Sequence, residues 1–293
     1  KNNGNSRMAL KPKKKALAAF FIYSEVAQEL FPQIGESEMA KAIAVTLQLQ
    51  VKSTNTEVKS ENVVALLKGS EKPDEYVVLS SHLDHIGMEA DGDINNGADD
   101  DGSGTVAMLE IAEAFKKAAD AGKGPKRSLV FLHVTGEEKG LLGSQYYTDM
   151  EPLIPLDQTV ANLNIDMIGR VDPKREGSQN YIYLIGSDRL STELHELSEE
   201  ANKKYIQLEL DYTYNDRNDP NRFYFRSDHY NFAKNNIPII FYFNGTHDDY
   251  HRPSDTPDKI NYDLLKSRTQ LIFHTAWDLA NRDQRVVVDK DGK

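Results

Sequence analysis

The chain has 293 residues, of which 39% are hydrophobic and 28% are charged, as in an ordinary globular protein. Its net charge of −11 argues against nucleic acid as a partner, because phosphate binding requires a basic surface. The chain contains no cysteine, which excludes disulfides, thiolate metal sites and a cysteine nucleophile. No apolar run approaches the roughly 18 residues needed to cross a bilayer.

Residues 1–45 differ in pattern from the rest of the chain. A basic stretch there leads into a short apolar run at residues 18–22, which predicts a strand, and residues 35–44 predict a short helix. In residues 45–51, apolar and polar side chains alternate, which indicates a half-buried antiparallel strand. We therefore expect residues 1–45 to form an N-terminal segment and residues 46–293 to form the main domain.

From residue 61 onward, apolar strands alternate with amphipathic helices, with a turn-like stretch at residues 70–75. Ser103 stands where the N-cap of the first of these helices is expected. The alternation predicts an α/β protein, a three-layer αβα sandwich with a mixed, mostly parallel central sheet. Strands are predicted within residues 61–69, 75–82, 127–136, 159–169, 180–187 and 237–243, and helices within residues 103–120, 190–205 and 261–282.

Polar clusters follow the carboxyl ends of the predicted strands. His82 ends one strand, three aspartates (residues 99–101) precede a helix, two glutamates (residues 137–138) follow a second strand, and His251 follows the last. Taken singly, such clusters are ordinary solvated loops or helix N-termini. Asp166 is different, because an ionised carboxylate at the end of an apolar strand is costly unless it is paired or bound to a metal. Sites in open α/β sheets lie beyond the carboxyl ends of strands, so we expect these clusters to meet.

The combined residues have the chemistry of a metal site. Neutral imidazole and carboxylate oxygen are standard ligands for zinc, although the same set would accept Mn²⁺ or Co²⁺. Two histidines and three carboxylates can hold two metal ions if one carboxylate bridges them. A further, unbound carboxylate is needed to take the proton from an attacking water, and the pair Glu137 and Glu138 offers one base and one ligand.

Six short motifs occur in order along the chain, namely HLDHIG, GADDDGSG, TGEEKGLLGS, NLNIDMIGR, FRSDHYNF and DDYHRPSDTPDKI. They resemble the motifs of the bacterial di-zinc aminopeptidases related to leucyl aminopeptidase, with glutamate carboxypeptidase and glutaminyl cyclase as more distant relatives. The resemblance covers residues 46–285. It implies a phosphorylase/hydrolase-like fold, two zinc ions per chain and peptide substrates with a free N-terminus, hydrolysed by a water that the two metals activate.

The resemblance also implies a role for each metal-binding residue. His82 and Asp166 would bind the first metal. Asp100 would bridge the two metals, and Glu138 and His251 would complete the second. The peptide bond that follows the bridging aspartate is cis in this family, so we expect a cis bond after Asp100.

Other residues would assist the metals. The carboxylate of Asp84 would accept a hydrogen bond from the far nitrogen of the first metal-bound histidine, as the outer partners of such histidines usually do. Glu137 would be the general base, and the hydroxyl of Tyr250 would steady the oxyanion. Arg226 and Asp228 fall in the family's RSD-containing segment beside the cleft, where we expect them to shape the substrate pocket.

Three more histidines lie near these motifs. His85 follows His82 by three residues, and on an extended strand the two side chains would point apart. We therefore expect His85 to lie near the site without binding a metal. The same expectation holds for His229 and His247.

Three alternative functions remain open. A glutaminyl cyclase shares the fold but binds a single zinc ion. A carboxypeptidase would need a cationic pocket for the substrate carboxylate, which Arg222 or Arg226 could supply. A non-catalytic binding module of this fold would lack the ligands, whereas all five ligands and the base are present here.

The N-terminal segment resembles, more weakly, the end of a protease-associated domain, so it could be the remnant of one. The chain begins at Lys1 and has no signal-like apolar segment, as in a mature or trimmed product. The family resemblance implies a secreted or periplasmic protein. We expect peptide substrates as partners, no nucleic acid and no membrane span, and we favour a monomer.

Overall fold

The computed structural model of the protein describes residues 8–10, 22–35 and 56–291. Residues 60–291 belong to one compact unit, which carries all the predicted site residues. Residues 22–35 belong to a second unit and contain helix α1 (Ser24–Leu30).

Most of the N-terminal predictions fall outside the described residues. This applies to the strand expected at residues 18–22, apart from its last residue, and to the helix expected at residues 35–44, apart from its first. It applies wholly to the strand expected at residues 45–51. The division of the chain at residue 45 stays a prediction.

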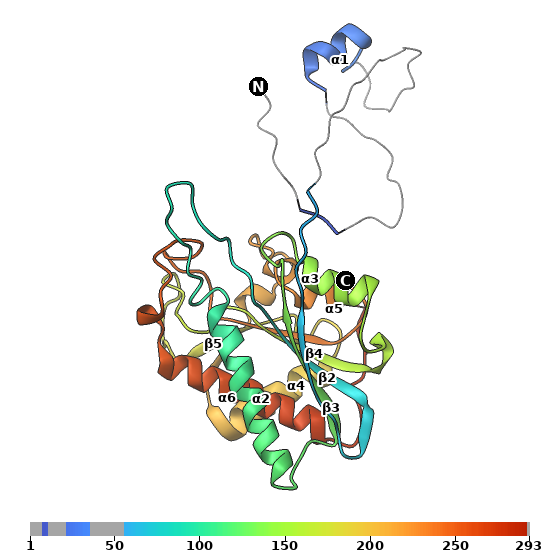
Figure 1. The fold of residues 1–293 in the computed structure, drawn as a ribbon, viewed down its shortest axis with the longest axis vertical. Helices are drawn as coiled ribbons and strands as arrows, with labels where there is room; N and C mark the ends of the chain where they lie inside the picture. Colours follow the sequence, from blue (N-terminus) through green and yellow to red (C-terminus); the bar gives the residue numbers. More distant parts are fainter. Residues whose placement is uncertain (1–7, 11–21, 36–55, 292–293) are drawn as a thin grey trace. The chain divides into compact units, whose positions relative to one another are not determined.

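A mixed seven-stranded sheet forms the centre of the larger unit (Figure 1). Four neighbouring strands in the middle of the sheet run parallel to one another. The strand at one edge is antiparallel to its neighbour, and the two strands at the other edge are parallel to each other and antiparallel to the middle four. The predicted α/β fold with a mixed sheet is therefore confirmed. In spatial order the strands are β1 (Val63–Leu67), β3 (Arg127–Val134), β2 (Lys72–His82), β4 (Thr159–Ile165), β7 (Ile239–Phe243), β5 (Tyr181–Ile185) and β6 (Glu209–Asp211).

Helices cover both faces of the sheet, as the predicted three layers require (Figure 1). One face carries α2 (Gly102–Asp120), α4 (Thr192–Ala201) and α6 (Tyr262–Asn281). The other carries the short helices α3 (Leu142–Gln145) and α5 (His229–Ala233).

Among the described residues, no helix combines the length and the apolar character that crossing a membrane demands. The remaining short helices are the π-helices η1 (Tyr146–Met150) and η3 (Asn202–Ile206) and the 3-10 helices η2 (Leu156–Gln158), η4 (Thr213–Asn215), η5 (Phe223–Phe225) and η6 (Pro257–Lys259).

Side chains of the central strands divide the core into two halves. Val77 and Leu79 of β2 pack into the half covered by α2, α4 and α6, whereas Val78 packs into the other half. Tyr242 and Phe241 of β7 are divided in the same way. Successive side chains of a strand point to opposite faces, so strands covered on both faces are apolar throughout, as their sequences are.

Two local predictions are wrong, and one strand has no prediction. Ser103 does not cap α2; Asp101 does, since its carboxylate accepts a hydrogen bond from the backbone N–H of Gly104 at 3.0 Å. The turn-like residues 70–75 largely belong to β2, which begins at Lys72 with an irregular register. The three-residue strand β6 was not predicted, because it is too short for a periodic pattern.

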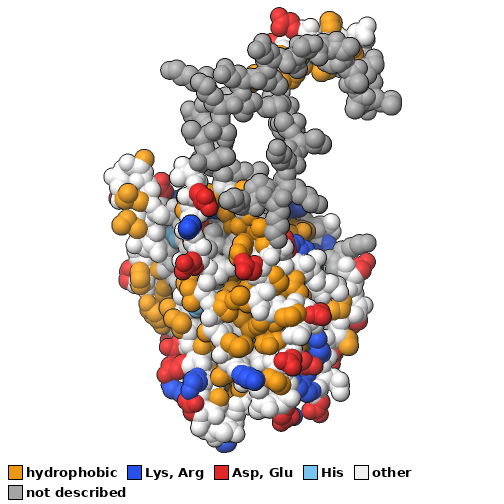
Figure 2. Space-filling view, turned by 45° about the vertical axis from the view of Figure 1, so that its right-hand side comes forward, with side chains coloured by type: hydrophobic (Ala, Val, Ile, Leu, Met, Phe, Trp, Pro, Cys, Tyr) orange, Lys and Arg blue, Asp and Glu red, His pale blue; other side chains and the backbone are white. Residues whose placement is uncertain are grey.

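Charged side chains are spread over the surface shown in Figure 2. Basic side chains lie there singly or in small groups among acidic ones, and an apolar area lies between them.

The parallel strands bring the predicted site residues to one edge of the sheet. His82 is the last residue of β2, and Asp166 directly follows β4. Glu137 follows β3 by three residues, and His251 lies in the loop after β7. Asp100 lies in the loop that leads into α2.

Candidate metal centre

His82, Asp100 and Asp166 form a first group of potential ligands. The Nε2 atom of His82 lies 3.1 Å from Oδ1 of Asp100 and 3.6 Å from Oδ1 of Asp166. All three side chains are buried, and one ligand atom from each lies within 4.8 Å of the others. Three donors held this close can bind a single ion.

A second group forms around the other oxygen of the same aspartate. The Nε2 atom of His251 lies 3.1 Å from Oδ2 of Asp100 and 3.3 Å from Oε2 of Glu138. The structure thus brings together all five residues expected to bind metal. Asp100 lies between the two groups, with one carboxylate oxygen toward each, which is the position that a bridging ligand requires.

The atoms that face this space fit a cation. His82 Nε2, Asp100 Oδ2 and Glu138 Oε1 are buried and make no hydrogen bond with any described residue. Although burial alone would lower it, contact with Asp100 and Asp166 raises the pKa of His82 well above its usual value. The carboxylates around this space therefore favour a positive charge between them. Imidazole nitrogen and carboxylate oxygen are also the ligand atoms of zinc sites.

His85 lies closer to the second group than expected. Its Nδ1 atom is 2.9 Å from Oε1 of Glu138 and 3.9 Å from Oδ2 of Asp100, and neither of its ring nitrogens has a hydrogen-bond partner among the described residues. β2 ends at His82, so the alternation of side chains along a strand does not extend to His85. His85 is therefore a sixth potential ligand.

Asp84 contacts the site differently from the prediction. The far nitrogen of His82, Nδ1, donates to the backbone carbonyl of Asp84 at 2.8 Å, whereas the carboxylate of Asp84 is 3.9 Å away. This contact places the proton on Nδ1 and leaves Nε2 free to bind an ion. The carboxylate instead accepts hydrogen bonds from the backbone N–H groups of Glu137 and Glu138, at 3.1 and 3.3 Å. Asp84 thereby connects the strand that carries His82 to the loop that carries the glutamate pair.

Two further aspartates, not predicted, hold the loop of the bridging residue. Asp101 is buried and accepts hydrogen bonds from the backbone N–H groups of His82 and Met167, both at 3.1 Å. Asp255 is also buried and accepts from the backbone N–H groups of Asp99 and Asp100, at 3.0 and 3.3 Å. Both stand inside motifs already quoted, but nothing in the sequence assigns their carboxylates to these partners.

The peptide bond between Asp100 and Asp101 is cis, as the family resemblance implied.

The other two histidines near the motifs, His247 and His229, have structural partners. His247 Nε2 lies 3.1 Å from Oδ2 of Asp99, and buried His229 donates from Nε2 to the carbonyl of Tyr224 at 2.8 Å. Neither contacts the five predicted ligands through a described hydrogen bond or ion pair.

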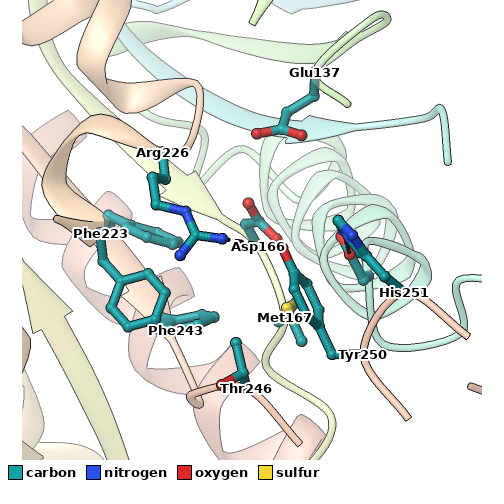
Figure 3. Close-up of a pocket in the computed structure, with 11 residues that line it drawn as sticks. Glu137, Asp166, Met167, Phe223, Arg226, Phe243, Thr246, Tyr250 and His251 are labelled. Carbon is teal, nitrogen blue, oxygen red and sulfur yellow. Dashed lines mark hydrogen bonds and ion pairs between the residues drawn. The ribbon is translucent and has the colours of Figure 1, made fainter. Parts of the chain in front are cut away.

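A pocket opens beside the two groups (Figure 3). Glu137, Asp166, Arg226 and Tyr250 all line it. Burial raises the pKa of Glu137 well above its usual value, and the nearby carboxylates raise it further, although contact with His82 opposes them. A carboxylate with a raised pKa is suited to accept a proton near neutral pH.

Tyr250 and Arg226 contact each other at this pocket, but Asp228 does not reach it. The guanidinium of Arg226 donates to the Tyr250 hydroxyl at 3.4 Å, and the Tyr250 ring stacks on His251 with ring centroids 3.8 Å apart. Asp228 is fully buried and accepts a hydrogen bond from Ser144 Oγ at 2.5 Å. The pocket-shaping role expected of Asp228 therefore has no support in this geometry.

Comparison with known families identifies the chain. Residues 62–276 match the profile of peptidase family M28. The chain belongs to this family. The resemblance found in the six motifs is thereby confirmed, since the match extends over more than half of this M28 chain and includes every predicted ligand.

Individual relatives carry several peptidase names. The M28 chain is 34% identical over 108 residues to a probable glutamate carboxypeptidase of Arabidopsis thaliana, a match that covers 37% of this chain and 15% of that protein. It is 34% identical over 148 residues to a probable leucine aminopeptidase of Aspergillus oryzae, covering 50% of this chain and 26% of that protein. The chain thus spans about a quarter or less of the length of these curated relatives.

A solved structure shares the fold. The zinc aminopeptidase BSAP from Bacillus subtilis superposes with a TM-score of 0.60 at 23% identity. The match covers 79% of this M28 chain and 53% of that protein. At this identity the comparison supports the fold alone, and it agrees with the predicted αβα architecture.

Proposed function

We propose that this M28 peptidase is a zinc-dependent aminopeptidase, which hydrolyses the first peptide bond of substrates with a free N-terminus. The observation that supports the proposal best is the position of Asp100 between two groups of ligands, with Glu137 beside them in an open pocket. A site for two ions with an adjacent unbound carboxylate suits hydrolysis by an activated water.

Each group of side chains would hold one zinc ion. His82 and Asp166 would bind the first, Glu138 and His251 the second, and Asp100 would bind both. Bound zinc would polarise the scissile carbonyl group and make the attacking water more acidic. His82, Asp100 and Asp166 are buried, which supports tight binding because water has little access to compete for their ligand atoms.

The protein's own residues would carry the proton and orient the substrate. Glu137 would take a proton from the attacking water and pass it to the leaving amine. The carboxylates that line the pocket would accept hydrogen bonds from the free α-ammonium group of the substrate. The hydroxyl of Tyr250 would donate a hydrogen bond to the developing oxyanion, with Arg226 holding the hydroxyl from the other side.

A carboxypeptidase is the second candidate function. The observation that favours it is Arg226, which lines the pocket and could bind a C-terminal carboxylate. Arg222, the other arginine considered, does not line this pocket. A single-zinc glutaminyl cyclase has less support, because the donor atoms form two groups joined by Asp100.

The experiment that tests the proposal compares blocked and unblocked peptides. An aminopeptidase releases the first residue from peptides with a free N-terminus, including those amidated at the C-terminus, and leaves N-acetylated peptides intact. Cleavage of N-acetylated peptides at a free C-terminus would replace the proposal with a carboxypeptidase. Action outside the cytoplasm and a monomeric state are also proposed, and both rest on the family resemblance alone.

A further inference from the structure

Arg226 presents a guanidinium group to the pocket beside the metal centre (Figure 3). It follows the short helix η5, its side chain lies over the ring of Phe223 at 5.0 Å, and it reaches the Tyr250 hydroxyl at 3.4 Å. Phe243 lies next to Phe223 on the same wall, with ring centroids 4.9 Å apart. The pocket therefore joins an aromatic wall to a guanidinium group.

The charge of Arg226 is not matched by a carboxylate of the protein. Within the described part of the chain, Arg226 makes no ion pair. Other arginines of this acidic protein do have carboxylate partners: Arg170 pairs with Asp249, and Arg175 pairs with Asp211. An unpaired guanidinium that lines a pocket is suited to bind an anionic group of a ligand.

We propose that Arg226 binds a carboxylate of the substrate close to the scissile bond, so that the enzyme selects substrates that carry one. A guanidinium binds a planar carboxylate through two parallel hydrogen bonds, which makes this pairing strong and directional. The aromatic wall of Phe223 and Phe243 would pack against the methylene groups that lead to the carboxylate. The inference rests on the proposed peptidase function and adds a substrate class to it.

Two parts of a peptide could supply this carboxylate. One is the side chain of an N-terminal glutamate or aspartate, and the other is the C-terminal carboxylate of a dipeptide. Either carboxylate would make the same contact with Arg226, but a different change to the substrate removes the negative charge in each case. Glutamine in place of glutamate removes the first, and amidation of the C-terminus removes the second.

Arg222 provides a matched control. It lies just before η5, four residues from Arg226, and its guanidinium lies over the ring of Phe225 at 4.9 Å. It lines a separate pocket with Arg189 and Asp219 rather than the pocket at the metal centre. Arg222→Gln therefore removes the same charge from the same short segment without touching the proposed contact.

The test measures kcat/KM for two substrate pairs in the zinc-loaded enzyme. The first pair is the glutamyl and glutaminyl anilides, and the second is Leu-Gly and its C-terminal amide. For each pair we divide kcat/KM of the charged substrate by that of its neutral counterpart. We expect Arg226→Gln to lower one of these two ratios about ten- to hundredfold, because a hydrogen bond between charged groups contributes that much to binding. Arg226→Lys should retain part of that ratio, and Arg222→Gln should retain all of it.

The outcome assigns the source of the carboxylate or overturns the proposal. A fall in the glutamyl-to-glutaminyl ratio identifies the N-terminal side chain, and a fall in the acid-to-amide ratio identifies the C-terminus. The proposal is wrong if Arg226→Gln leaves both charged-to-neutral ratios of kcat/KM unchanged. This holds even if the variant slows the hydrolysis of all substrates equally, because Arg226 would then act only through Tyr250. If the wild type cleaves no unblocked substrate, the proposed aminopeptidase fails separately, and N-acyl dipeptides with free and amidated termini then test Arg226.

Discussion

The two carboxylate oxygens of Asp100 face two different histidines. Oδ1 lies 3.1 Å from Nε2 of His82, and Oδ2 lies 3.1 Å from Nε2 of His251. The two histidines stand 169 positions apart in the numbering, 251 − 82, and reach the same aspartate because their strands end at one edge of the sheet. The predictions below depend on this arrangement.

Removal of the Asp100 carboxylate should affect both ions. We expect Asp100→Ala to reduce bound zinc from two ions per chain to one or none, because each ligand group loses an oxygen. Elemental analysis of the purified variant measures this. Asp120→Ala is the control, since Asp120 is exposed at the end of α2 and pairs with Lys116 of the same helix. Two tightly bound ions in Asp100→Ala would show that this residue is not the bridge.

Replacement of Glu137 should separate chemistry from metal binding. Glu137→Gln keeps the size of the side chain but cannot accept the proton, so we expect kcat to fall by at least about 10²-fold. Zinc content should remain close to that of the wild type, because Glu137 belongs to neither ligand group. Steady-state kinetics and elemental analysis on the same preparation measure both. Hydrolysis at the wild-type rate would remove Glu137 from the mechanism.

Loss of His85 should weaken the second ion selectively. Its Nδ1 atom lies 2.9 Å from Glu138, so it either binds the ion or orients that ligand. We expect His85→Ala to lower the affinity for one of the two zinc ions about ten- to hundredfold. Competition with a chromophoric chelator measures both affinities. His274→Ala, on α6 against Tyr205, is the control, and equal loss in the two variants would contradict a role for His85 at the metal.

The stability of the fold should depend on the neutral form of His229. This side chain is fully buried, stacks on Phe241 with centroids 4.6 Å apart, and donates to the Tyr224 carbonyl. Burial lowers its pKa to about 3, whereas the unfolded chain takes up the proton near the usual value of 6.5. Its contribution to stability is therefore complete above pH 6.5 and is lost as the pH falls toward 3.

The measurement is the free energy of unfolding in urea, compared between the wild type and His229→Gln from pH 7 to pH 4 in the presence of a metal chelator. The difference in unfolding free energy should shrink by about 1.4 kcal/mol per pH unit below pH 6.5. Neighbouring Asp228 acts in the opposite direction, because burial raises its pKa to about 7, but its contribution is shared by both proteins and cancels in the difference. A difference that does not change with pH would mean that His229 is not kept neutral by the fold.

Much of the fold and all five proposed ligands could be predicted from the sequence. The core strands are apolar on both faces, so their existence follows from composition and length, and the family motifs stand at their ends. Asp166 was the most informative single residue, because a carboxylate at the end of a buried strand needs a partner. Its position 3.6 Å from His82 agrees with that reasoning.

The supporting contacts could not be predicted in the same way. Asp255 holds the backbone of Asp100, 155 positions earlier in the chain, and no periodic pattern links two loops so far apart. Asp84 contacts His82 through its backbone carbonyl rather than its carboxylate, a choice set by the local course of the chain. His85 lies near the site as expected, but its distance of 2.9 Å from Glu138 depends on the loop that follows β2 and has no signal in the sequence. Loops that meet only in three dimensions decide these details.

The most direct test of the account is the number of zinc ions per chain, measured together with activity. The account predicts two bound zinc ions, loss of aminoacyl-anilide hydrolysis on chelation, and full recovery only after two equivalents of zinc are restored. One zinc ion per chain with full activity would contradict it, since Asp100 would then not bridge two metals. One zinc ion with ammonia release from an N-terminal glutamine peptide would instead identify a glutaminyl cyclase.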